Sequence, residues 1–206
     1  MRAALAEAAA DEGIARAAAV IVLSAIYWRN TWKYQARGYR HLFWDSGTML
    51  ANLLAAASAL GQGPRLETGF VDADVNHMLG LDPEHEAALE IVVLGAGAPP
   101  AAPAPRLDDI HHDVLPLSSA QVDYPELREA YAASTLASAA EVRRWRAGAP
   151  PSAREPRAPL TPLPPARVAA GRTLGETVQR RGSTRQFAHV PPRIRLRIAR
   201  PWRTSS

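Results

Sequence analysis

The stretch that decides the fold runs from Tyr27 to Gly63 and reads YWRNTWKYQARGYRHLFWDSGTMLANLLAAASALGQG. It contains three of the five Trp, three of the five Tyr and the only Lys of the chain, Lys33. Cationic side chains are interleaved with these rings, namely Arg29, Lys33, Arg37 and Arg40. Large rings gather where they bury area or stack on a planar ligand. Two interpretations therefore stay open for this stretch, a packed core and a binding site.

Hydrophobic periodicity predicts the elements around it. Residues 3–18 read as an Ala-rich helix, and Val20–Tyr27 has the length and branched residues of a buried strand. We expect an aromatic, Arg-rich loop next, then a helix that begins at Asp45 or Ser46 and ends at Gly61. The apolar residues of this helix recur at spacings of three and four, namely Met49, Leu50, Leu53, Leu54, Ala57 and Leu60. Small residues fill the other face, which predicts that the helix packs on both sides.

The remaining elements of this region are shorter. Leu66–Val71 reads as a strand, Asp72 as the N-cap of a helix over Ala73–Leu79 that Gly80 closes, and Ala87–Leu94 as a last strand. The order of strands and helices predicts an α+β fold, α/β-like in character, with one central buried helix.

Composition divides the chain. Residues 1–140 carry nine basic against 17 acidic residues, whereas residues 141–206 carry 15 Arg against three Glu, and 16 of the 18 Pro follow residue 98. We therefore expect a domain over 1–98, a Pro/Ala-rich linker over 99–170 with one helix at 125–146, a separate segment over 171–190, and a basic disordered tail over 191–206.

The absence of Cys excludes disulfides and thiolate sites. The N-terminus lacks the continuous apolar stretch of a signal peptide, and the apolar residues Ala17–Ile26 are too few to cross a bilayer. We expect a cytoplasmic protein without a membrane segment.

The pattern W-K-Y-x-x-R-G-Y-R at 32–40, followed by a D-x-G turn and a helix of small residues, resembles the SagB-type dehydrogenases. These are FMN-dependent members of the nitroreductase-like superfamily. The resemblance implies that Lys33 and Tyr34 are catalytic in the oxidation of peptide azolines, in which a base removes a carbon-bound proton while hydride passes to the flavin. Gln35-Ala36 and Thr48 depart from the family pattern, which often has Gly and an acidic residue at the first two positions and His at the third.

Two further segments resemble FMN-binding parts of this superfamily. Thr68-Gly69, within Glu67–Phe70, is similar to a turn whose backbone faces the flavin edge, although a plain start of a strand explains it equally well. Arg181, Ser183 and Arg185 match an R-x-S-x-R signature that holds the FMN phosphate, in a tail where Arg is common by chance.

In the superfamily this signature opens a domain, but here it follows the W-K-Y block. The chain therefore reads as the C-terminal half of one nitroreductase-like domain and the opening of a second. Such sites are completed across a dimer, so the resemblance implies a homodimer or a partner nitroreductase-like chain, with a peptide substrate. The competing hypothesis is a non-catalytic scaffold or dimerisation partner.

Two weaker signals complete the sequence. His111-His112-Asp113 has ligand types for a metal, but adjacent side chains in an extended loop point apart, so we expect no metal site. The basic tail has the charge for nucleic acid but shows no known module, so we expect no nucleic-acid partner.

Overall fold

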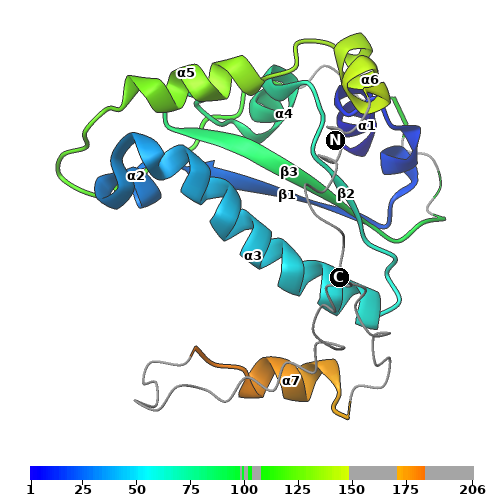
Figure 1. Cartoon of the computed structure of the whole chain (residues 1–206). Coiled ribbons are helices and arrows are strands. Elements are labelled where there is room, and N and C mark those ends of the chain that lie inside the picture. The colour runs from blue at the N-terminus through cyan, green and yellow to red at the C-terminus, as the bar shows by residue number, and fades with distance from the viewer. Residues whose placement is uncertain (98, 100–101, 104–107, 149–170, 184–206) are drawn as a thin grey trace, which may run out of the picture. The chain divides into compact units, whose positions relative to one another are not determined.

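The computed structural model describes residues 1–97, 99, 102–103, 108–148 and 171–183. The chain divides into two compact units, residues 1–164 and 165–206. The first unit is built on a three-stranded sheet with helices on both faces (Figure 1). The expected α+β fold is confirmed.

The sheet has the order β1-β3-β2, with β1 at Ala19–Ile26, β2 at Arg65–Glu67 and β3 at Glu86–Leu94. Both pairings are antiparallel. The strands predicted at Val20–Tyr27 and Ala87–Leu94 are confirmed to within a residue or so at each end. The strand predicted over Leu66–Val71 is wrong in length, because pairing with β3 stops at Glu67.

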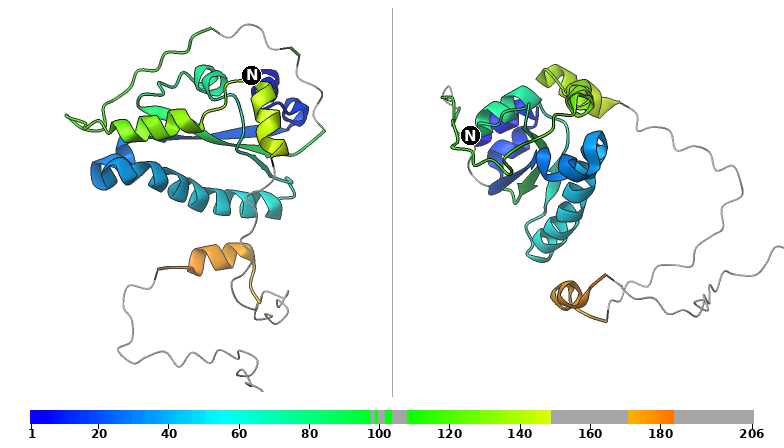
Figure 2. Two further views of the ribbon diagram at one scale, coloured as in Figure 1. Left: turned by 45° about the horizontal axis from the view of Figure 1, so that its top comes forward. Right: turned by 90° about the vertical axis from the view of Figure 1, so that its left-hand side faces the viewer.

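Helices cover the two faces of the sheet (Figures 1 and 2). The helices α1 at Arg2–Ala8, α4 at Asp72–Leu79 and α6 at Ala139–Ala147 enclose one core, which includes Leu5, Val75, Ile91 and Val142. On the other face, α3 at Gly38–Ala59 and α5 at Pro125–Ser134 enclose a smaller core around Leu42, Leu89 and Leu127.

The single helix predicted over residues 3–18 is wrong. The helix α1 ends at Ala8, Ala10 takes φ 49°, and Asp11 then caps a 3-10 helix, η1, at Glu12–Arg16. The Val71 N–H donates to the Ala8 carbonyl at 2.8 Å, so the end of α1 bonds to another part of the fold. This tertiary hydrogen bond replaces the next turn of the helix.

The predicted aromatic loop is also wrong. Residues of this stretch form helix α2 at Trp28–Tyr34, a short 3-10 turn η2 at Gln35–Arg37 and the first two turns of α3. Asp45 and Ser46 are therefore interior residues, not N-caps. A Cβ at Gly38 would lie 2.7 Å from Thr31 Cγ2, so glycine is what lets α2 and α3 approach this closely.

The helix α3 is buried along one side only. The buried side carries Leu42, Ser46, Leu50 and Ala57. Met49 and Leu60, which were predicted as core residues, are exposed. The prediction of packing on both sides therefore fails for the described part of the chain.

Two helices stand where one was predicted over 125–146. The helix α5 ends at Ser134, and Ser138 caps α6 by accepting from the Glu141 N–H. Between them Leu136 forms a parallel bridge with Val71, and its N–H donates to Asp72 Oδ2 at 2.8 Å. Asp72 is thus the first residue of α4 and bonds to Leu136 instead of capping its own helix, whereas Gly80 closes α4 at φ 64°, as predicted.

The second unit contains helix α7 at Leu174–Arg180. Thr173 and Glu176 form a capping box at its start, with each side chain bonded to the other residue's backbone N–H. Residues 171–183 are all exposed.

Candidate functional site

Lys33 and Tyr34 lie in the last turn of α2. The Tyr34 ring stacks on the imidazole of His41, with centroids 3.6 Å apart and planes inclined by 9°. His41 meets Trp44 edge-on at 4.7 Å, so three rings form a continuous stack on the α2–α3 junction. The Lys33 ammonium lies 5.2 Å from the Tyr34 ring centroid, and its side chain is exposed.

His41 is a residue that the sequence reasoning missed. Its Nε2 atom is buried and has no hydrogen-bond partner among the described residues. Spacing along the chain gives no signal for this contact, because residues seven apart on one helix lie about 10.5 Å apart along its axis. The two rings meet because η2 turns the chain between α2 and α3.

The backbone at Gln35 is unusual. It takes φ 55° and ψ −142°, a conformation that L residues rarely adopt. Glycine adopts a positive φ without strain, so Gln35 is a costly residue at this position. The chain keeps the bend between α2 and η2 despite the side chain.

The aromatic block is divided between core and surface. Tyr27 is buried, and its hydroxyl donates to the Pro83 carbonyl at 3.2 Å; burial raises the pKa of this phenol, with Tyr131 nearby adding to the shift. Trp32 and Trp44 are instead 62% and 55% exposed. The interpretation as a packed core is thus correct for Tyr27, whereas the interpretation as a binding site stays a prediction for the exposed rings.

Two pockets adjoin α2 and share Trp28. One, of about 490 Å³, is lined by Trp28, Arg29, Trp32, Leu117, Ser118 and Ala120. The other, of about 320 Å³, lies between Tyr27, Trp28 and Thr31 on one side and residues 121–128 on the other. Both pockets are therefore lined partly by α2 and partly by residues of 117–128, and the predicted catalytic pair, Lys33 and Tyr34, lines neither.

The turn at Thr68-Gly69 follows the end of β2. The Thr68 side chain is exposed, but Gly69 is buried, because the indole of Trp145 from α6 lies on it. A Cβ at Gly69 would lie 2.7 Å from Cε3 and Cζ3 of that ring. Only glycine leaves room for this contact.

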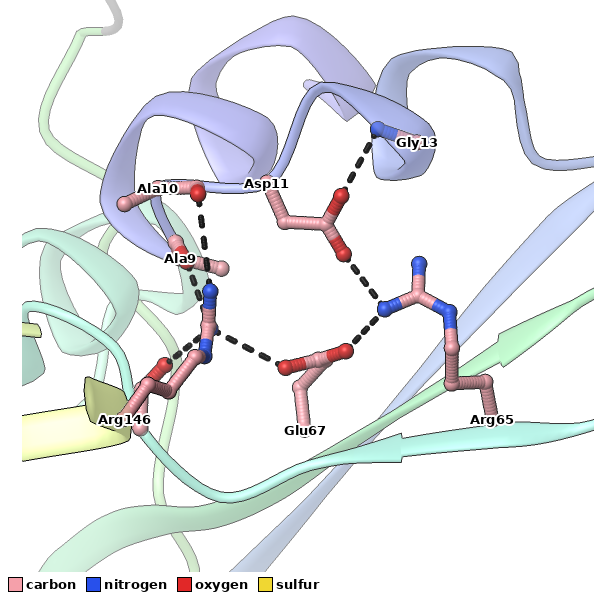
Figure 3. Close-up of polar contacts among 8 residues, drawn as sticks. Ala9, Ala10, Asp11, Gly13, Arg65, Glu67 and Arg146 are labelled. Atoms are coloured by element: carbon pink, nitrogen blue, oxygen red, sulfur yellow. Dashed lines mark hydrogen bonds and ion pairs between the residues drawn. The ribbon is translucent and has the colours of Figure 1, made fainter. Parts of the chain in front are cut away.

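Arg146, the neighbour of Trp145, fastens α6 to the same turn (Figure 3). Its Nη2 donates to the carbonyls of Ala9 at 2.6 Å and Gly69 at 2.9 Å, and pairs with Glu67 Oε2 at 3.0 Å. Neither Trp145 nor Arg146 was predicted as part of a site, since no local pattern announces a contact between residues 69 and 145.

Glu67 also joins a second arginine. Arg65 pairs with both Glu67 and Asp11, which links β2 to the start of η1 (Figure 3). Partial burial raises the pKa of Asp11, but hydrogen bonds from the Gly13 N–H and Arg65, with the charges of Arg65 and Arg146, outweigh it and lower the pKa. The network holds Asp11 and Glu67 in contact with arginines.

The predicted phosphate-binding residues belong to the second unit. Arg181 follows α7, where its N–H donates to the Thr177 carbonyl, and Ser183 is exposed two residues later. Arg185 lies outside the described residues. The phosphate-binding role of all three stays a prediction.

The structure does not bring the predicted residues of the first unit together. Lys33 and Tyr34 lie on α2 at one end of the unit, and Gly69 lies beneath α6 at the other (Figures 1 and 2). If they serve one site, the two groups must come from different copies or chains.

The N-terminal part of the chain has the architecture of a small antiparallel sheet with a long helix across one face and a turn after that helix. Residues 2–96, which hold these elements, match the model of the Nitroreductase family. This part of the chain is therefore nitroreductase-like, in agreement with the resemblance at the superfamily level.

Solved structures similar to the chain include that of a proposed nitroreductase from Anabaena variabilis, with 24% identity and a TM-score of 0.47. The match covers 65% of this chain and 27% of that one, so the chain spans about a quarter of its length. No curated protein matches the chain.

The family implies FMN as a cofactor, and a bound flavin would need room beside the Glu67–Phe70 turn. As arranged in the first unit, the turn does not fit a flavin edge, because the Trp145 ring lies on Gly69 and Arg146 holds the Gly69 carbonyl. A planar group needs the space that the indole fills.

Two other findings concern metal sites and membrane-spanning helices. Over the described ranges, no three or more His, Asp or Glu side chains gather as metal ligands. His112 instead places Nε2 2.7 Å from the Leu79 carbonyl. Among the helices of the described segments, none combines the length and hydropathy that a bilayer span requires.

Proposed function

We propose that the chain is part of an FMN-dependent oxidoreductase of the SagB type that oxidises azoline-containing peptides. Residues 1–98 supply the C-terminal half of one site, and Arg181, Ser183 and Arg185 would hold the FMN phosphate in the opening of a second nitroreductase-like domain. The observation that carries the proposal is the nitroreductase-like match of residues 2–96, with Lys33 and Tyr34 in the W-K-Y pattern at the end of α2.

Within this proposal, Tyr34 or Lys33 removes the carbon-bound proton of the azoline ring. His41 positions Tyr34 by stacking on its ring, since the two planes are nearly parallel. The groove lined by Trp28 and Trp32 lies on the same helix as the pair and offers the faces of these rings to an extended peptide. The Lys33 side chain is exposed, so a partner surface must cover it to remove it from water.

The partner that we propose is a second copy of this chain, paired through the open side of α3. Nothing lies within 4 Å of a Cβ built at Gly47, and Ala51 is exposed one turn further along the helix. Small residues let a second helix approach closely, and Trp44 and Met49 flank them with exposed apolar area. Pairing of two copies offers a route by which α2 of one approaches the turn of the other.

The first experiment tests the catalytic pair. The full chain is incubated with FMN and a thiazoline-containing peptide, and conversion to the thiazole is followed by mass spectrometry. Lys33→Ala and Tyr34→Phe are expected to abolish conversion without changing FMN affinity. Arg16→Ala, an exposed cation of η1 that lines neither pocket, is the control and should leave conversion unchanged. Loss of FMN affinity in the first two variants would reassign this end of α2 to cofactor binding.

The second experiment tests the pairing. Ala51→Glu places a charge on the open side of α3 and should give a monomer in size-exclusion chromatography with light scattering. Ala132→Glu, an exposed alanine on α5, is the control and should not change the mass. A monomeric parent chain would rule out the second copy as partner.

A second candidate function is favoured by the Trp145–Gly69 contact. A chain whose flavin-facing turn is permanently covered would serve only as a scaffold or dimerisation partner for another nitroreductase-like chain. A dimer that stays colourless in excess FMN, even when Trp145 is removed, would support this alternative.

A further inference from the structure

We propose that α6 is an intramolecular cap on the Glu67–Phe70 turn, and that FMN and the tip of α6 compete for it. The inference rests on the proposed function, since it concerns the same turn. It assigns Trp145 and Arg146 a regulatory role: while they are docked, the first unit cannot present the turn to a flavin.

The contacts at the tip of α6 are those that a flavin edge would need to replace. The Trp145 indole, a flat aromatic group, lies on Gly69 within van der Waals distance. The Arg146 guanidinium donates to the Gly69 carbonyl at 2.9 Å. A planar ring and a hydrogen-bond donor thus already occupy the turn, which leaves no room for a second planar group on the same face.

The cap has a fixed part and a movable part. At the fixed part, the side chain of Val142 is fully buried in the core, and Leu136 is bridged to Val71 and bonded to Asp72. At the tip, Trp145 keeps 52% of its surface exposed although it covers Gly69. A side chain exposed to this degree gives up only part of its packing when it swings away. Opening the tip also breaks the contacts of Arg146 with Ala9, Gly69 and Glu67, but it leaves the fixed part packed.

The contacts that Arg146 makes at the tip are polar, unlike those of Val142 in the core. Arg146 pairs with Glu67, which Arg65 also contacts, and reaches the carbonyls at the end of α1. Opening the tip leaves Glu67 paired with Arg65, so no buried carboxylate is left alone. The turn therefore tolerates both the capped and the open arrangement.

Two variants of the full chain separate the arrangements. Trp145→Ala with Arg146→Ala removes the tip and keeps Val142 and Leu136. Val71→Cys with Leu136→Cys, at bridged positions, introduces the only two cysteines of the chain, and their disulfide ties the segment before α6 to the residue that follows the turn. The reduced form of this variant is its own control. Arg143→Ala, an exposed cation on α6, is the matched control for the tip variant.

The measurement is FMN titration by quenching of flavin fluorescence, with amide hydrogen exchange as a second readout. The tip variant is expected to bind FMN at least tenfold more tightly than the parent. The oxidised and reduced forms of the disulfide variant should bind FMN alike, because the tip opens while Leu136 stays bridged to Val71. Because coupling is reciprocal, FMN should accelerate exchange in α6 of the parent. The control Arg143→Ala should match the parent in both readouts.

The outcomes distinguish the cap from the proposed function. If the parent and the tip variant bind FMN equally, the cap is wrong and the flavin site stands. If neither binds FMN, nor the reduced disulfide variant, the proposed function is wrong and the cap falls with it. Faster exchange at Gly69 and Phe70 in the tip variant, together with tighter FMN binding, supports both.

Discussion

The packing of α6 against the N-terminal half of the chain gives the sharpest prediction of stability. Val142 has 0% exposure and lies in the same core as Leu5, Val75 and Ile91, which are 51 to 137 residues away in sequence. Truncation of Val142→Ala removes two carbon atoms, at about 0.8 kcal/mol each, and leaves a cavity. Ala is a better helix former by about 0.5 kcal/mol, which offsets the cavity. The net loss of unfolding free energy is about 2 kcal/mol.

Urea unfolding followed by circular dichroism measures this loss. With a slope of about 2 kcal/mol per molar urea, the midpoint of Val142→Ala should fall by about 1 M. Val122→Ala is the matched control, since Val122 is in the same unit and 57% exposed, and its midpoint should move by no more than about 0.2 M. Equal midpoints for the two variants would refute the docking of α6 and, with it, the cap.

Other predictions concern the backbone, the buried acid and the catalytic pair. Gln35→Gly should stabilise the chain by about 1 kcal/mol, because glycine adopts φ 55° without strain, whereas Ala36→Gly should destabilise it; urea midpoints that move together would contradict this. Burial raises the pKa of Glu90, which Ser46 only partly offsets through a hydrogen bond of 2.5 Å. The free energy of unfolding of the parent therefore falls as pH rises above the ordinary pKa of 4.5. The variant Glu90→Gln should be more stable relative to the parent at pH 7 than it is below pH 4.5. A gap between the two that is independent of pH would rule out the buried charge as the cause. Lys33→Ala should lose azole formation while Arg16→Ala keeps it, as measured by mass spectrometry.

Local patterns predicted the parts of the fold that depend on local physics. The strands β1 and β3 are continuous apolar stretches of strand length, and Gly80 closes α4 in the left-handed conformation that glycine favours. These features need no knowledge of distant residues. The resemblance of the W-K-Y block at 32–40 to the nitroreductase-like superfamily likewise rests on a contiguous motif, and residues 2–96 match that family.

The errors come from contacts between distant residues. The α2 helix was read as a loop because Trp, Asn and Thr are modest helix formers, but packing of Thr31 against Gly38 stabilises it. Ser46 looked like an N-cap and instead donates its hydroxyl to Glu90 across the core. The covering of Gly69 by Trp145 joins residues 76 positions apart, which no pattern along the chain predicts.

The structure bears on the arrangement of the candidate site, whereas the roles of its residues stay predictions. Lys33 and Tyr34 do lie side by side on one helix, but the structure adds His41 beneath Tyr34 and separates the pair from Gly69. The roles of Thr68, Arg181, Ser183 and Arg185 in holding FMN stay predictions, as does a cytoplasmic location. A resemblance transfers residue roles, whereas their distances depend on how copies and segments assemble.

The measurement that tests the central claim most directly is FMN titration of the full chain without the α6 tip, the variant Trp145→Ala with Arg146→Ala. The account predicts saturable binding that approaches one flavin per chain and is weaker in the parent. Flavin fluorescence that stays unquenched in both proteins would contradict the claim that this nitroreductase-like half carries a flavin site.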